Sequence, residues 1–177
     1  VIENVRNNFD CVAKEHNIIL TTQEQENLPE IYADSQRLGQ VLTNLVSNAI
    51  KSTPDGKNIT IKSELKNSDQ IAQNPYFEED LKALNGTYVL VSVVDEGVGI
   101  KKENMQKAFD KFTQIESPLS RKVGGTGLGL PIAKQLIEAH NGKIWCDSEE
   151  NVGTSFHFVI PISEKTVSGK TIQKELL

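Results

Sequence analysis

Residues 34–53, DSQRLGQVLTNLVSNAIKST, decide how the rest of this chain is interpreted. Asp34 stands before the first periodic residue as an N-cap, and Pro54-Asp55-Gly56 supplies a stop and a turn. Between them, apolar residues recur at three- and four-residue steps, which is typical of one face of an α-helix. That face consists of Leu38, Val41, Leu42, Leu45, Val46, Ala49 and Ile50.

The opposite face of this predicted helix is unusual because it carries amides and cations but no carboxylate. At about 100° per residue, its polar side chains fall within an arc of roughly 100°. One interpretation is a solvated face of neutral polar residues, and the other is a face that meets an anionic ligand or its metal. The rest of the chain favours the second. The arc consists of Arg37, Gln40, Asn44, Ser47, Asn48 and Lys51.

The bulk composition fits one soluble globular domain with tails. The chain has 177 residues, a net charge of −5 and a pI near 5.3, which argues against a nucleic-acid surface. We see neither a membrane span nor a signal peptide, and the start at Val1 leads us to expect a fragment of a longer protein. Cys11 and Cys146 lack a CxxC pattern or a His companion, so we expect two reduced structural cysteines.

Periodicity along the rest of the chain predicts an α/β (α+β) two-layer sandwich, with a mixed sheet of about five main strands and helices on one face. Helices are expected over 1–15 and 128–140, the second with Pro131 in its first turn and Gly142 as its stop. The apolar run 87–95 is typical of a central strand. The expected strands are 18–20, 31–33, 58–66, 87–95, 143–147 and 154–160.

Two polar segments interrupt this pattern. Residues 67–86 form an excursion between paired strands, with a helical turn expected in FEEDLKAL, residues 77–84. Residues 101–126 are mostly polar, are broken by Phe109 and Phe112, and end in a glycine run.

Asp95-Glu96-Gly97-Val98-Gly99-Ile100, here called the base loop, places a carboxylate at the end of the central strand. Such a carboxylate can accept a hydrogen bond from an exocyclic amine, and the glycines let a flat ring approach the backbone. The alternative is a tight turn in which the Asp only caps the backbone.

Residues 124–129, GGTGLG, here called the glycine segment, open the helix that follows. Successive backbone N–H groups at a helix N-terminus favour a phosphate. Without Gly-Lys-[Ser/Thr] the segment is not a P-loop, and without a preceding strand it is not a dinucleotide fingerprint. A loop that binds no ligand remains the alternative.

Taken together and in this order, these motifs resemble the Bergerat-type ATP-binding fold, and within it the catalytic and ATP-binding domain of sensor histidine kinases. The resemblance covers residues 18–162. It implies the end of a dimerisation or acceptor helix and a junction over 1–17, a catalytic domain over 18–163 and a tail or linker over 164–177. Its motifs are NLVSNAIKST (44–53), DEGVGI (95–100), KAFDKFTQ (107–114), GGTGLGL (124–130) and GTSFHF (153–158).

The resemblance also implies roles for single residues. Asp95 would hold the adenine amino group, Asn48 would coordinate Mg²⁺, and Lys51 would reach the phosphates of ATP. A flexible lid over about 110–126 would supply charge from Arg121 or Lys122, with Phe109 and Phe112 anchoring it. Ser52 stands where the family often has an aromatic residue, so stacking on the nucleotide is not implied there. The remaining implied contacts are Ser52, Gly97, Gly99, Ile100, Gly125, Thr126, Gly127, Leu128, Gly129, Leu130 and Thr154.

Asn44 separates the branches of this family on chemical grounds. ATP-hydrolysing relatives place a Glu one helical turn before the Asn that binds Mg²⁺, where it activates water. An amide cannot take a proton from water at neutral pH, so we expect Asn44, Asn48 and Lys51 to serve phosphoryl transfer to a positioned acceptor instead.

No acceptor histidine is expected in this chain, because His16, His140 and His157 each fit local structure. The implied partners are the dimerisation helices of the same parent protein and a downstream response regulator. The parent is implied to be a cytoplasmic homodimer, or the cytoplasmic part of a membrane-bound sensor, and the isolated chain a monomer. Two alternatives remain open, namely an anti-sigma-type protein-serine kinase and a nucleotide-binding scaffold without catalysis.

Overall fold

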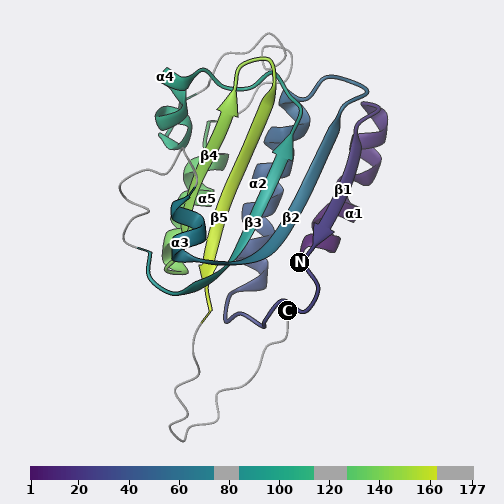
Figure 1. Ribbon diagram of the computed structural model, residues 1–177. Coiled ribbons are helices and arrows are strands. Elements are labelled where there is room, and N and C mark those ends of the chain that lie inside the picture. The colour runs from purple at the N-terminus through teal and green to yellow at the C-terminus, as the bar shows by residue number, and fades with distance from the viewer. Residues whose placement is uncertain (74–83, 114–126, 163–177) are drawn as a thin grey trace, which may run out of the picture.

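A five-stranded sheet forms the centre of the molecule, in a computed structural model that describes residues 1–73, 84–113 and 127–162 (Figure 1). The strand order is β1-β2-β3-β5-β4. Strand β1 runs parallel to β2, and the other neighbouring strands pair antiparallel. The expected mixed sheet is therefore confirmed. Its strands are β1 (Ile19–Glu24), β2 (Asn58–Asn67), β3 (Thr87–Asp95), β4 (Lys143–Glu149) and β5 (Gly153–Pro161).

Three long helices cover one face of this sheet, with α2 behind β3, α5 behind β4 and β5, and α1 behind the β1 edge (Figure 1). They are α1 (Ile2–Glu15), α2 (Ser35–Ser52) and α5 (Gly129–Ala139). Two short elements, α4 (Lys102–Met105) and the 3₁₀ helix η2 (Gln106–Phe109), follow the base loop. None of the described helices is long and apolar enough to cross a membrane.

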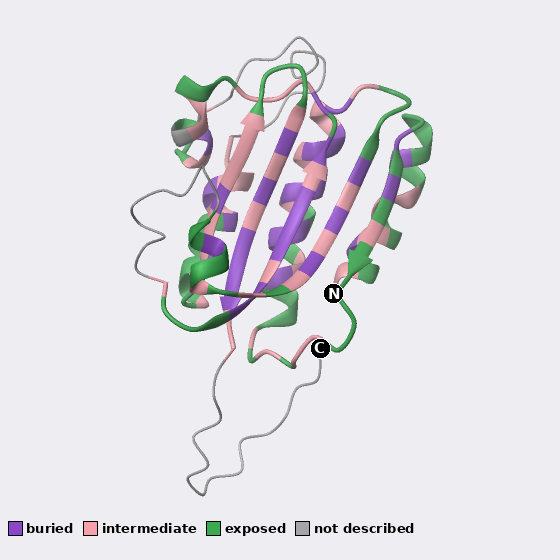
Figure 2. Ribbon diagram, viewed as in Figure 1, coloured by how far each residue is buried: buried purple, intermediate pink, exposed green. Residues whose placement is uncertain are grey.

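Helix α2 has the predicted position and the predicted buried face. The side chain of Asp34 accepts hydrogen bonds from the backbone N–H groups of Gln36 and Arg37, at 2.9 and 3.0 Å, so it is the N-cap. All seven predicted apolar residues are buried, and each buried Leu, Ile or Val contributes about 1.5–3 kcal/mol. Figure 2 shows the same concentration of buried residues on the central strands and on α2. The polar face of α2 is consequently left for other partners.

The short helix α3 (Ser68–Ala72) lies on the other face of the sheet (Figure 1). A capping box between Asn67 and Gln70 starts it. The expectation of helices on one face therefore holds for the long helices and not for α3. The helical turn expected over 77–84 lies outside the described residues, except for Leu84. On this face a second apolar cluster forms from Ile71, Tyr88, Trp145 and Val159, with Leu84 and Leu90 against it.

The strand expected over 31–33 is wrong, because these residues have no ladder partner in the described part of the chain. Ile31 and Ala33 pack against the main core, whereas Tyr32 is 77% exposed. The next backbone N–H, that of Asp34, donates to Nε2 of His140 at 3.1 Å. The alternation of these residues reflects an extended approach to the N-cap of α2.

The end of α5 also differs from the expectation that Gly142 is its left-handed stop. Asn141 takes that conformation, with φ of 56°. The N–H groups of Asn141 and Gly142 then donate to the carbonyls of Glu138 and Ile137, both at 3.0 Å, which is a Schellman motif. Gly142 is needed for another reason, since a Cβ there would overlap the carbonyl oxygen of Val159.

Candidate functional site

Asp95 is the last residue of β3 and is only 3% exposed. One of its two carboxylate oxygens has hydrogen-bond partners among the described residues, and the other has none. Its Oδ1 accepts the N–H groups of Gly97 and Thr154, at 2.9 and 3.2 Å. Its Oδ2 is buried and has no hydrogen-bond partner in the part of the chain that the structure describes. Burial raises the pKa of Asp95 to about 6, although the two N–H donors lower it in part. A buried acceptor without a donor indicates a place for a ligand's N–H group.

The base loop is held between the end of α2 and the turn that joins β4 to β5. Val98 donates its N–H to the carbonyl of Ser52 at 3.0 Å and accepts the N–H of Asn151 at 2.8 Å. A Cβ on Gly97 would lie 2.6 Å from the carbonyl oxygen of Ser52, and one on Gly99 would overlap the carbonyl oxygen of Glu149. Both glycines are therefore required by close backbone approach.

Asn44, Asn48 and Lys51 lie half-buried along one face of α2, as the helical spacing predicts. The amide Nδ2 of Asn44 donates to the carbonyl of Gly129 at 3.0 Å, which joins α2 to the first residue of α5. Ser52 turns its hydroxyl back onto the helix, toward the carbonyls of Asn48 and Ala49 at 3.0 and 3.1 Å. Ser52 thus contacts the base loop through its backbone rather than its side chain.

The end of the glycine segment begins α5. Leu128 is the N-cap residue and makes no side-chain capping bond, and Leu130 packs against the main core. The first N–H groups of a helix have no intrahelical partner, so this helix start suits an anion. Gly127 has φ of 67°, and its carbonyl accepts the N–H of Phe112 at 3.2 Å. The predicted contacts Arg121, Lys122, Gly125 and Thr126 lie outside the described residues.

The two phenylalanines expected to anchor the lid behave differently. Phe109 packs on the core and meets Phe156 edge-on, with ring centroids 6.1 Å apart. Phe112 is 75% exposed, and because most of the expected lid lies outside the described residues, its anchoring role stays a prediction. The backbone of Phe112 has φ of 63°, and its N–H donates a hydrogen bond to the carbonyl of Gly127.

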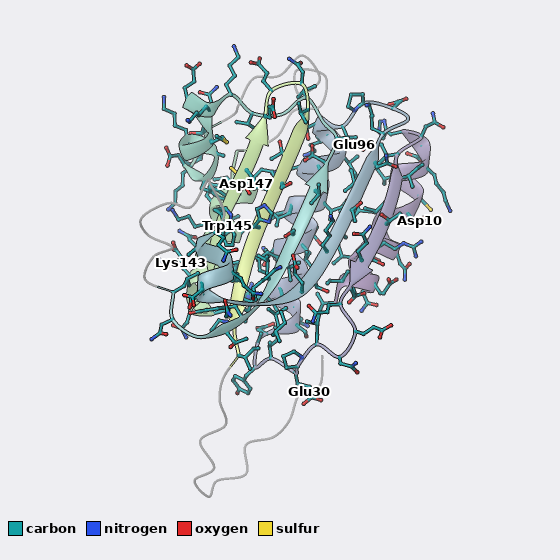
Figure 3. All side chains as sticks on the ribbon, viewed as in Figure 1. Asp10, Glu30, Glu96, Lys143, Trp145 and Asp147 are labelled. Atoms are coloured by element: carbon teal, nitrogen blue, oxygen red, sulfur yellow. The ribbon has the colours of Figure 1, made fainter. Side chains whose placement is uncertain are left out.

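Sequence reasoning missed two polar residues beside Asp95. Ser148, on β4 opposite Thr154, contacts Ile100, Gly153 and Thr154 through its hydroxyl. Glu96 accepts the backbone and side-chain N–H groups of Asn58, at 3.1 and 2.9 Å, and these bonds lower its pKa. Figure 3 shows Glu96 at the end of the sheet where the base loop lies. Strand alternation alone could have placed Ser148 on the helix-covered face with Thr154.

A cation at this site would depend on ligands that come with the nucleotide. Within the described residues there is no group of three or more His, Cys, Asp or Glu side chains that could hold a metal ion. Asn48 offers one amide oxygen on the polar face of α2. Mg²⁺ keeps several waters and is commonly held by one or two protein oxygens together with substrate phosphates, so Asn48 fits a metal of this kind.

Fold and site together define an α/β domain with a buried, partly unpaired carboxylate at the end of β3 and a helix start without a side-chain cap at α5, features that suit a nucleotide. The sequence profile of the family described as "Histidine kinase-, DNA gyrase B-, and HSP90-like ATPase" matches residues 33–164. The sensor histidine kinase WalK of Bacillus subtilis (strain 168) is 36% identical over 143 residues, covering 78% of this chain and 21% of WalK.

The solved structures that match this chain are also histidine kinases. The catalytic domain of the histidine kinase ThkA matches with a TM-score of 0.69 and 33% identity, covering 90% of this chain and 89% of that one. ThkA in complex with the response regulator protein TrrA matches with a TM-score of 0.65 and 31% identity, covering 92% of this chain and 39% of that one. The chain therefore belongs to the histidine kinase-, DNA gyrase B-, and HSP90-like ATPase family, as an ATP-binding catalytic domain of the sensor histidine kinase type.

Proposed function

We propose that this chain binds Mg²⁺-ATP and transfers its γ-phosphoryl group to a histidine on separate dimerisation helices of the same protein. The chain spans 21% of the length of WalK, so this activity belongs to a larger protein. We infer that the parent is a cytoplasmic homodimer, or the cytoplasmic part of a membrane-bound sensor, and that a response regulator receives the phosphoryl group. The match to a histidine kinase in complex with a response regulator supports the last step.

The observation that carries the proposal is the half-satisfied carboxylate of Asp95. Adenine presents an exocyclic amine, which is a donor, whereas guanine presents a carbonyl oxygen at the equivalent position. The buried Oδ2 of Asp95 can accept from the amine and would repel the carbonyl. Gly97 and Gly99 allow the backbone of the base loop to pack closely against its surroundings.

The phosphate end of the site is formed by α2 and the start of α5. The N–H groups and the dipole of α5 favour negative charge, and Lys51 adds a cation on the facing helix. Asn48 would hold Mg²⁺ together with the phosphates. When bound, Mg²⁺ neutralises charge that develops on the transferred group.

Asn44 favours transfer over hydrolysis. Its amide donates to the carbonyl of Gly129, and an amide cannot act as a general base toward water. Phosphoryl transfer therefore depends on an acceptor that is brought to the site. Lys51 and Asn48 then position the phosphates, and Asp95 positions the base.

The test is phosphoryl transfer from radiolabelled ATP in the presence of Mg²⁺. The isolated chain should neither hydrolyse ATP appreciably nor label itself, whereas fusion to its acceptor helices should give an acid-labile, base-stable phosphate. Asn48→Ala in the fusion should abolish labelling, and Gln135→Ala, which removes an exposed amide from α5, should leave it unchanged. Rapid turnover by the isolated chain, or a stable phosphate on one of its serines, would contradict the proposal.

A further inference from the structure

Ser148 joins two backbone segments that the sequence places far apart. Its Oγ accepts the N–H of Ile100 at 2.7 Å, donates to the carbonyl of Gly153 at 2.9 Å and lies 2.9 Å from Oγ1 of Thr154. A hydroxyl has one donor and two acceptor lone pairs. All three are used when Thr154 is the donor of the third bond, so the hydroxyl of Ser148 is fully committed.

The two joined segments are the ones that hold Asp95. The base loop runs from Asp95 to Ile100 and supplies the N–H of Gly97, and the start of β5 supplies the N–H of Thr154. Both N–H groups bind Oδ1 of Asp95, which leaves Oδ2 as the unpaired oxygen. A shift of either segment would therefore rotate or release the carboxylate. Ser148 contacts both segments at once.

We propose that Ser148 is a positioning residue for base recognition, which holds Asp95 in the orientation that presents Oδ2 to the amino group of an adenine ring. The inference rests on the proposed function, because it requires that Asp95 contacts the base. Ser148 acts through Ile100, Gly153 and Thr154, and its own hydroxyl is not needed for any contact with the nucleotide.

A merely structural role for Ser148 makes a different prediction. If its hydroxyl only stabilised the end of β4, its loss would weaken nucleotide binding equally at every pH. If it orients Asp95, its loss also weakens the bond from Thr154 to Oδ1, and this bond lowers the pKa of Asp95. The pKa of Asp95 would then rise further, and the pH profile of ATP affinity would move with it.

The experiment is calorimetric titration of the chain with Mg²⁺-ATP at several values between about pH 5 and pH 8, a range that spans the shifted titration of a buried carboxyl. In Ser148→Ala, ATP affinity should fall about tenfold at the upper end, as expected for buried groups left without a partner. The midpoint of the pH profile should move upward. Ser148→Thr, which keeps the hydroxyl, should match the parent in both ATP affinity and the midpoint of the pH profile.

Ser155→Ala is the matched control, because Ser155 is next to Thr154 in β5 but pairs with Asp147 on the other face of the sheet. It should change neither affinity nor midpoint. A Ser148→Ala variant whose pH midpoint equals that of the parent would overturn the inference. Where Ser148→Ala does not fold, Ser148→Cys makes the same comparison, and loss of the fold in both would also overturn it. A parent that binds no ATP contradicts the proposed function itself, and the first titration shows this.

Discussion

Asp95 is the residue at which burial and ligand recognition meet. Its pKa of about 6 means that the folded chain holds a proton more tightly than the unfolded chain, whose carboxyl titrates near 3.8. Between these two pKa values the free energy of unfolding therefore falls as pH rises. The destabilised form, the carboxylate with one unpaired oxygen, is the form that an adenine amino group would stabilise.

ATP affinity should consequently depend on the protonation of Asp95. Below about pH 6, affinity should fall by up to about tenfold per pH unit, because the proton must leave before the amine can bind. Above this pH it should be constant as far as Asp95 is concerned. Calorimetry at constant ionic strength measures the profile.

Asp95→Asn provides the control for this profile. An amide does not titrate, so the fall attributed to Asp95 should disappear. Affinity at neutral pH should drop about 10- to 150-fold, the value of a lost charge-assisted hydrogen bond. An unchanged profile in the variant would show that another group causes the pH dependence.

Between elements, the bond from Asn44 to Gly129 fixes where α5 begins relative to α2. Asn44→Asp replaces the N–H donor with a carboxylate that faces the carbonyl of Gly129. We expect ATP affinity to fall about 10-fold or more, because a partly buried hydrogen bond becomes a repulsion beside the phosphate end of the site. Asn44→Ala should cost less, since it removes the donor without adding a charge. Equal affinities for Asn44→Asp and the parent, measured by calorimetry, would contradict this coupling.

The turn after α5 makes a prediction about stability. Gly142→Ala should lower the free energy of unfolding by about 1–3 kcal/mol, because the added Cβ overlaps the carbonyl of Val159 and forces a backbone shift. Gly39→Ala is the matched control. Gly39 is inside α2, and among the described residues only Val1 lies near its would-be Cβ, at 4.0 Å, so the Gly39→Ala substitution should be neutral or stabilising. Urea unfolding of both variants measures these two changes in the free energy of unfolding.

Local patterns were sufficient for most elements. The three- and four-residue spacing in α2, its cap at Asp34 and the alternation of β2 and β5 are properties of single segments, and the structure confirms them. Segment 31–33 shows the limit of this reasoning. Its side chains do alternate between the core and solvent, but a β-strand also needs a neighbouring strand to pair with. That pairing cannot be predicted from the residues of one segment alone.

Across the whole molecule, nucleotide binding should stabilise the fold, since the site joins α2, the base loop, β5 and α5. At an ATP concentration about 100 times the dissociation constant, the gain is about 2.7 kcal/mol, or roughly 5–10 °C in the unfolding midpoint for a chain of this size. Differential scanning calorimetry with Mg²⁺-ATP measures it. Asp95→Asn at the same concentration should show a much smaller shift, and no shift in the parent would contradict the assignment of the site.

What the sequence could not supply were contacts between distant segments. The base loop and the α2 polar face could be located because each is a motif within one segment, and a helix face without a carboxylate is unusual for a solvated helix. The contacts of Ser148 and the partner of Asn44 were not predictable, because a lone serine or amide gains its role only when another segment lies beside it. The same holds for α3, whose place on the far face depends on Tyr88, Trp145 and Val159 together.

The hydrogen bond from Phe112 to Gly127 has a consequence for how this kind of domain can evolve. It joins a residue just before the segment 114–126 to the residue just after it, so the two sides of this segment are held together by a bond of their own. Closing a loop twice as long costs only about 0.6 kcal/mol. Insertions or a grafted peptide between residues 114 and 123, before the glycine segment, should therefore be tolerated by the fold. Lineages can lengthen this stretch while Asp95, Asn48 and the start of α5 stay in place.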